Sequence, residues 1–132
     1  MAVHPSRALT RIGTAAVATG IGHDLLGAWL YRRQLAGIAR DGLVDAVENA
    51  DLPAAERHRR EVALWFLTSG AAIGTVGAAL RGARATDGAV VPIGAGLTAM
   101  GVIGAAVLPR SGFWLLIGQG AAALSVARRA RR

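Results

Sequence analysis

Long apolar stretches without charged residues alternate with short charged segments along this chain. Residues 62–80, 88–109 and 111–127 form uncharged stretches of 19, 22 and 17 residues. A helix of about 20 apolar residues crosses the ~30 Å hydrocarbon core of a bilayer. The pattern therefore predicts three membrane-spanning helices, over about residues 60–80, 89–108 and 112–127.

A fourth apolar stretch lies near the N-terminus, over residues 12–31. His23 and Asp24 are the polar residues that interrupt it most strongly. A cleaved signal peptide is the alternative interpretation, because Arg7 and Arg11 resemble the charged segment that opens such a peptide. We expect a retained spanning helix.

Residues 32–59 form a polar connection between the first two predicted spans. Apolar residues recur at roughly helical spacing within it: Leu35, Ile38, Ala39, Ala46 and Val47. This spacing predicts a short amphipathic helix that lies at the membrane interface. Asp51 and Pro53 are typical of a helix start, so the second spanning helix is expected to begin near Pro53.

The predicted fold is therefore all-α, with residues 1–132 forming one membrane-embedded four-helix bundle and a short amphipathic interfacial helix between helices 1 and 2. Four spans place both termini on the same side. Eight arginines fall on that side and seven on the other, and four of the eight cluster at residues 128–132. Because basic residues favour the cytoplasmic side, we expect a multi-pass protein of the plasma membrane with both termini in the cytoplasm.

Small residues recur at spacings of three and four within the predicted spans. Helices in lipid associate through close backbone approach, so such positions predict helix contacts. The predicted packing glycines are Gly20, Gly27, Gly70, Gly74, Gly101 and Gly118. The alternatives are packing within one bundle and a glycine face that stays free to bind a partner helix.

Composition and charge narrow the function classes. Hydrophobic residues make up 53% and charged residues 17%, against about 45–50% and 25% in soluble proteins. The net charge of +7 comes from arginines at the edges of apolar stretches, where they face lipid headgroups, so we do not expect nucleic-acid binding. The chain contains no cysteine, which excludes disulfides and thiolate metal sites. The expected partners are the lipid bilayer and a second copy or another membrane protein.

His23 and Asp24 are the residues with the strongest potential for chemistry, since ionisable groups inside a membrane are costly and are usually retained for a reason. Gln119, with Thr68 and Ser69, would complete a polar pocket around them. The alternatives are structural hydrogen bonding between helices, a proton or ligand site, and metal or haem ligation. A lone intramembrane histidine lacks partners at metal spacing, so we expect no metal and no cofactor. We assign no catalytic residue, because no catalytic motif occurs in a suitable setting.

Four segments together resemble a known family: GIGHDLLG at residues 20–27, IARDGLVDAV at 38–47, WFLTSG at 65–70 and LPRSGFWLLIGQG at 108–120. The chain is similar to a family of small bacterial proteins with four transmembrane helices, catalogued as a domain of unknown function. The resemblance implies a four-span fold. It draws attention to Trp65 as a further ligand-binding candidate, and also to His23, Asp41, Gly42, Pro109, Gly112, Trp114 and Gln119.

The sequence thus predicts a small accessory or interaction subunit of the plasma membrane. The alternative is a module for small-ligand binding or for proton or solute transport, built around His23, Asp24 and Gln119. A membrane enzyme that uses His23 as a general base is a third hypothesis.

Overall fold

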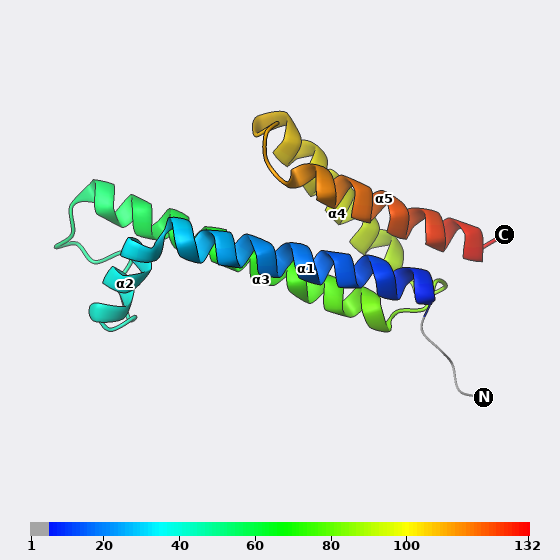
Figure 1. Ribbon diagram of the computed structural model, residues 1–132, viewed down its shortest axis with the longest axis horizontal. Coiled ribbons are helices and arrows are strands. Elements are labelled where there is room, and N and C mark those ends of the chain that lie inside the picture. Colours follow the sequence, from blue (N-terminus) through cyan, green and yellow to red (C-terminus); the bar gives the residue numbers. More distant parts are fainter. Residues whose placement is uncertain (1–5) are drawn as a thin grey trace. The chain divides into compact units, whose positions relative to one another are not determined.

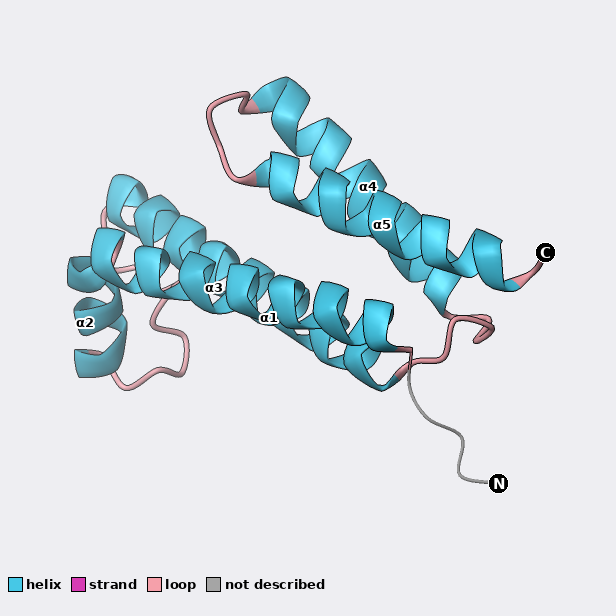
Figure 2. Cartoon of the chain, turned by 45° about the vertical axis from the view of Figure 1, so that its right-hand side comes forward, coloured by secondary structure: helices cyan, strands magenta, loops and turns pink. Residues whose placement is uncertain are grey.

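The computed structural model describes residues 6–132, which fold into five helices and contain no strand. The helices are α1 (Arg7–Leu30), α2 (Arg32–Arg40), α3 (Ala54–Gly82), α4 (Val90–Val107) and α5 (Phe113–Ala130). Figure 1 follows them in chain order, and Figure 2 shows the loops that join them. The prediction of an all-α fold is confirmed for these residues.

Each predicted span coincides with one of the four long helices and extends beyond it by at most one residue at either end. The helix α3 begins six residues before the predicted span, at Ala54, directly after Pro53. The Pro53 carbonyl accepts hydrogen bonds from the backbone N–H groups of Glu56 and Arg57, at 2.9 and 3.1 Å. Proline suits the start of a helix because its missing N–H has no intrahelical role there. The expectation that this helix begins near Pro53 is confirmed.

Two helices, α3 and α4, are long and apolar enough to cross a membrane. That property rests on length and composition. The helix α1 is less apolar because His23 and Asp24 lie within it, and α5 is less apolar because its last turn carries Arg128 and Arg129. Among the described residues, two helices are thus capable of spanning a membrane, whereas the sequence pattern predicts four spans.

The polar connection forms a shorter helix than expected. The helix α2 ends at Arg40, so Ala46 and Val47 lie outside it, in a segment of turns over residues 41–53. Gly42 has a φ of +92°, in the left-handed region that glycine adopts without steric cost. This conformation ends the helix, and the chain then turns back toward α3. The prediction that the helical pattern continues through Val47 is wrong.

The contacts of the chain group into two compact units, which we describe separately. The first unit contains residues 6–19 of the N-terminal part and everything from Ile73 onward, and the second contains residues 20–72. The helices α1 and α3 each contribute to both units.

In the first unit, helices pack through glycine. A Cβ atom added to Gly77 of α3 would lie 2.7 Å from the Gly13 carbonyl oxygen of α1, and one added to Gly120 of α5 would lie 2.6 Å from the Gly94 carbonyl oxygen of α4. Backbones that approach this closely leave no room for a side chain. Larger side chains fill the rest of this unit's core, and the largest fully buried ones are Leu9, Leu80, Leu116 and Val90.

The glycines at these contacts differ in part from the expected set. Gly20, Gly27, Gly70 and Gly101 are buried. Gly74 and Gly118, by contrast, have open space where a Cβ atom would stand. The close approaches on their helices are made instead at Gly77 and Gly120, which face the partner helix.

Candidate functional site around His23 and Asp24

His23 is held by a single residue of the facing helix. Its Nε2 lies 3.1 Å from the Phe66 carbonyl oxygen, and its ring stacks on the Phe66 ring with centroids 3.9 Å apart and planes 7° apart. A carbonyl oxygen can only accept, so Nε2 carries the proton of this hydrogen bond. In the neutral imidazole this leaves the Nδ1 lone pair available.

Two glycines make this arrangement possible. A Cβ atom added to Gly27 would lie 2.6 Å from Cδ1 of Phe66, so glycine there gives the phenyl ring its space beside α1. Gly70, one turn after Phe66, would bring a Cβ atom within 2.9 Å of the Gly20 carbonyl oxygen. The missing side chains let α1 and α3 come close enough for an α1 imidazole to reach an α3 carbonyl.

The Asp24 side chain points in a different direction from that of His23, because consecutive positions on a helix are about 100° apart. Its carboxylate lies against Gly70 and occupies the place that a Cβ atom there would take. Its Oδ1 is buried and has no hydrogen-bond partner within the part of the chain that the structure describes. A buried carboxylate oxygen without a partner is costly, so this position requires an explanation.

Asp24 also lines an open groove of about 530 Å³ between α1 and α3. The other lining residues are mostly apolar: Ile21, Leu25, Ala28, Leu67, Thr68 and Ala71. Because all of them belong to the second unit, the groove is complete within residues 20–72. We call it the Asp24 groove.

Trp65 is outside this groove, and 64% of it is exposed. Its carbonyl oxygen accepts the hydroxyl groups of Thr68 and Ser69, at 3.0 and 2.7 Å. Both hydroxyls are therefore occupied by their own helix, although the sequence suggested that they complete a polar pocket around His23.

Gln119 belongs to the first unit. Its Nε2 donates to Thr19 Oγ1 at 2.9 Å, and its Oε1 is buried with no hydrogen-bond partner among residues 6–132. The hydrogen bond from Gln119 to Thr19 thus links α5 to α1. Of the four candidate residues, only His23 and Asp24 are neighbours within one unit and face α3 together.

A second polar cluster, centred on Arg60, was not anticipated from the sequence. Arg60 is 5% exposed, and one guanidinium nitrogen lies 2.7 Å from both Asp41 Oδ2 and the Ala46 carbonyl oxygen. Its Nε lies 3.3 Å from Glu56 Oε1. A Cβ atom at Gly37 would lie 2.7 Å from the guanidinium, so glycine there leaves room for the cation.

These carboxylates raise the pKa of Arg60: the hydrogen bond that its guanidinium donates to Asp41 is the largest cause, and the one that it donates to Glu56 is the next that raises the pKa. Arg60 therefore stays charged while it holds Asp41 and the backbone of Ala46. A signal for this role exists in the sequence: Arg60 continues the spacing of three and four that leads to Ala63, Leu67 and Gly70. The neighbouring Arg57 and Arg59 obscure that register, because Arg60 then looks like one more residue of a charged segment.

A model of a family of unknown function (DUF6463) matches residues 7–132, nearly the whole chain. The chain belongs to this family. The expectation of an uncharacterised family is therefore confirmed. No curated protein and no solved structure matches the chain significantly.

In this DUF6463 member, one of the segments that carry the resemblance forms the turn between α4 and α5. The indole Nε1 of Trp114 donates to the Pro109 carbonyl oxygen at 3.0 Å, and Ser111 Oγ donates to the Leu108 carbonyl oxygen at 2.6 Å. These bonds satisfy carbonyl groups that follow the end of α4. The turn of the α4–α5 hairpin is thus stabilised by hydrogen bonds that involve Trp114, Pro109 and Ser111.

The acidic and histidine side chains of residues 6–132 do not form a metal site. No group of three or more His, Asp or Glu residues with suitable geometry occurs within this range. His4, which the sequence places at the membrane edge, lies outside the described residues.

Proposed function

We propose that this protein is a multi-pass plasma-membrane protein in which α1, α3, α4 and α5 span the bilayer, α2 lies at its interface and both termini are cytoplasmic. In this role it acts as a small accessory or interaction subunit. The observation that carries the proposal is that many large apolar side chains are exposed along helices that approach one another closely at glycine.

The closest backbone approaches between helices are made at glycine, while many large apolar side chains point outward. Trp29, Leu25, Ile103 and Trp114 are each more than half exposed. Only 22% of the apolar 18-residue segment of α3 and 28% of that of α4 are buried. The core helix of a water-soluble protein, by contrast, is mostly buried. Lipid is the solvent in which such outward faces carry no hydrophobic penalty.

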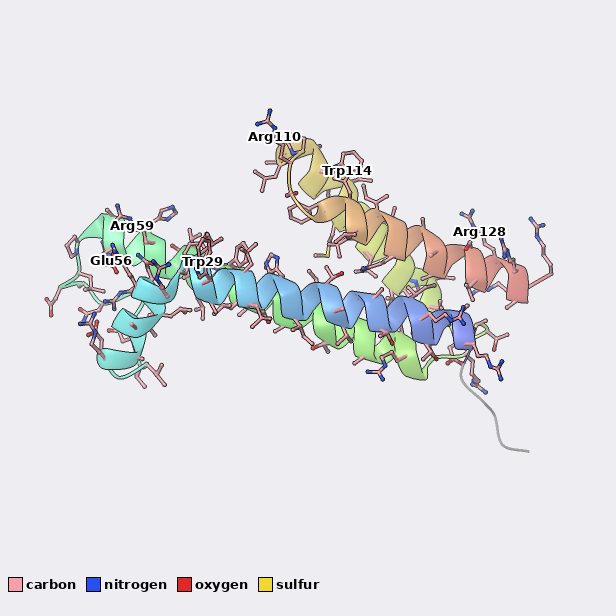
Figure 3. The ribbon with its side chains drawn as sticks, in the orientation of Figure 1. Trp29, Glu56, Arg59, Arg110, Trp114 and Arg128 are labelled. Carbon is pink, nitrogen blue, oxygen red and sulfur yellow. The ribbon has the colours of Figure 1, made fainter. Side chains whose placement is uncertain are left out.

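The charged residues of the α4–α5 hairpin support the same assignment. Arg110 and Trp114 lie at the turn, and Arg128 lies toward the other end of α5 (Figure 3). Arginine and tryptophan at the two ends of an apolar helix match the headgroup regions of a bilayer. The whole of α5, with 18 residues, extends about 27 Å, close to the ~30 Å thickness of the hydrocarbon core.

The membrane assignment is tested by extraction of cell membranes with alkaline carbonate. We expect the full chain to remain in the membrane pellet and to leave it only with detergent. Release into the carbonate supernatant would contradict the assignment. The accessory role is tested separately, by sizing the protein after gentle detergent solubilisation. We expect a complex larger than one chain, and a stable monomer would contradict this role.

The second candidate is a proton or small-ligand site at His23 and Asp24; Gln119, which the sequence groups with them, belongs to the other unit. Its support is that Asp24 Oδ1 is buried without a hydrogen-bond partner in the described chain. Polar atoms left in this way suit a ligand that donates hydrogen bonds. Proton flux into vesicles that contain the protein, abolished by Asp24→Asn, would support this candidate, and equal flux in both proteins would eliminate it.

A further inference from the structure

We infer that the Asp24 groove docks a transmembrane helix of another protein, and that this helix carries a lysine or arginine near its midpoint. The inference rests on the membrane-spanning role proposed above. It adds to that role the surface that binds the partner and the chemistry that recognises it.

The first argument is the unpaired carboxylate. Within residues 6–132, Oδ1 of the Asp24 side chain has no hydrogen-bond partner and is buried against Gly70. Asp24 lies near the middle of the apolar stretch over residues 12–31, thirteen residues after Arg11 and eight before Arg32, and in the last third of α1. At this depth in a bilayer neither water nor lipid headgroups satisfy a carboxylate, so a basic side chain is its best partner.

The second argument is that the chain supplies no such group at that depth. All its basic residues except histidine are arginines, and these lie outside the apolar stretches. The hydroxyls of five residues donate to carbonyls of their own helices: Thr19, Thr68, Ser69, Thr98 and Ser125. His23 is bonded to Phe66. A second copy therefore brings no cation to Asp24, which favours a different protein as the occupant.

The shape of the groove also suits a transmembrane helix. Ala28 and Ala71 are exposed alanines along it, so the backbone of a partner helix can approach closely. Ile21 and Leu25 expose 56% and 68% of their surface and form an apolar wall. An apolar helix with one central cation matches a groove of apolar side chains with one central carboxylate.

The experiment uses the full chain in phosphatidylcholine vesicles with a synthetic Leu/Ala transmembrane peptide of about 20 residues. One peptide has a central lysine, and its matched control has leucine at that position. Association is measured by energy transfer between the labelled peptide and an acceptor on a cysteine that replaces Arg132. We expect the lysine peptide to bind wild type about tenfold more tightly than Asp24→Asn, and the leucine peptide to bind both equally.

A second pair of variants keeps Asp24 and changes only the shape of the groove. Ala28→Leu and Ala71→Leu fill it, and we expect both to weaken binding of the lysine peptide. Ala15→Leu and Ala78→Leu place the same side chain at exposed positions of the same two helices outside the groove. These controls should bind the lysine peptide as wild type does.

Three results would overturn the inference: no preference of wild type for the lysine peptide, equal binding by Asp24→Asn, or equal binding by the groove variants and their controls. Energy transfer between two labelled copies of the chain, lost in Ala28→Leu, would identify a second copy as the occupant and would also overturn it. Vesicle flotation separates this failure from that of the proposed function. A chain that does not float with the vesicles contradicts the membrane role, whereas a chain that floats without a lysine preference contradicts only the docking inference.

Discussion

Neighbouring glycines on one helix differ in what they do. On α3, a Cβ atom at Gly77 would lie 2.7 Å from both the Gly13 carbonyl oxygen and the Val17 backbone nitrogen, whereas one at Gly74 meets nothing within 4 Å. Backbone atoms cannot move aside as a flexible side chain can. Three residues turn a helix by about 300°, so the two positions are on the same broad face and differ in direction by about 60°, and Gly77 but not Gly74 lies where α1 approaches most closely.

We predict that Gly77→Ala lowers the free energy of unfolding by about 1–3 kcal/mol, as is typical when a methyl group is forced into a closely packed contact. Gly74→Ala adds the same methyl group in open space, so it should leave stability unchanged or raise it slightly. Thermal unfolding in detergent micelles followed by circular dichroism measures both. Equal unfolding temperatures for the two variants would show that the contact at Gly77 is not tight.

Asp87 stabilises the turn that connects α3 and α4. Its carboxylate accepts hydrogen bonds from the backbone N–H and the Nε of Arg84, each at 2.8 Å. The backbone bond first and the side-chain bond second lower the pKa of Asp87 below its ordinary value of 3.8. A lowered folded-state pKa means that the ionised form stabilises the turn at pH values above the ordinary pKa. That stabilisation is lost as the pH falls through the lower, folded-state value.

We therefore predict that hydrogen exchange of residues 84–88 stays slow from neutral pH to about pH 4 and accelerates, after correction for intrinsic exchange, at lower pH. Asp87→Asn should remove this acid dependence, because the amide does not titrate. Thr86→Ala, at an exposed position in the same turn, serves as the control and should retain it. An identical pH profile in Asp87→Asn and wild type would contradict the role of the carboxylate.

At the scale of elements, Arg60 of α3 bonds the turns over residues 41–53 and packs against Gly37 of α2. Its bonds to Asp41 and the Ala46 carbonyl oxygen hold that segment on α3. Leu43 and Asp45 have φ values of 67° and 57°, which are unfavourable for residues with side chains. A segment in this conformation depends on bonds from outside, and Arg60 supplies them.

We predict that Arg60→Met, which keeps most of the side-chain length but removes the charge and the donors, speeds hydrogen exchange of residues 42–53 severalfold. Exchange in α4 and α5 should not change, because neither helix takes part in these bonds. Arg59→Met removes the neighbouring charge at an exposed position and is the matched control. If both variants exchange alike over residues 42–53, the segment is held by something other than Arg60.

At the scale of the whole molecule, the proposed topology has a direct test because the chain contains no cysteine. Single cysteines replace Thr86, between α3 and α4, Ala50, between α2 and α3, and Ser111, between α4 and α5. We predict that a membrane-impermeant thiol reagent added to intact cells labels the cysteines at 50 and 111 and not the one at 86. Labelling of all three, or of position 86 alone, would contradict four spans with cytoplasmic termini.

Hydrophobic periodicity was sufficient to predict the helices, because each apolar stretch is long and ends in charges, glycine or proline. The start of α3 near Pro53 and the short helix between α1 and α3 were both predictable. The end of α2 was not, because Ala46 and Val47 continue the helical spacing although the chain has already turned at Gly42. Periodicity records which residues are apolar and does not detect a change of backbone direction.

The candidate site was predictable in part, for a related reason. His23 and Asp24 attract attention as ionisable residues in an apolar stretch, and their sequence alone identifies them. Their partners do not follow from it: the Phe66 carbonyl that receives His23, and the Gly70 surface beneath Asp24, depend on the register of two facing helices. Arg60 was missed because a buried arginine and an exposed one look the same in a run of charges.

The sequence by itself determined the helical class, the approximate extent of each long helix and the positions of the ionisable pair in the first apolar stretch, since these depend on the local spacing of apolar and polar residues. The tertiary structure alone decided which glycines form contacts, that Thr68 and Ser69 bond their own helix, and that Asp24 lies unpaired beside an open apolar groove. Those features depend on how one helix is rotated and shifted against another. That choice is made by contacts between residues dozens of positions apart, which no local pattern records.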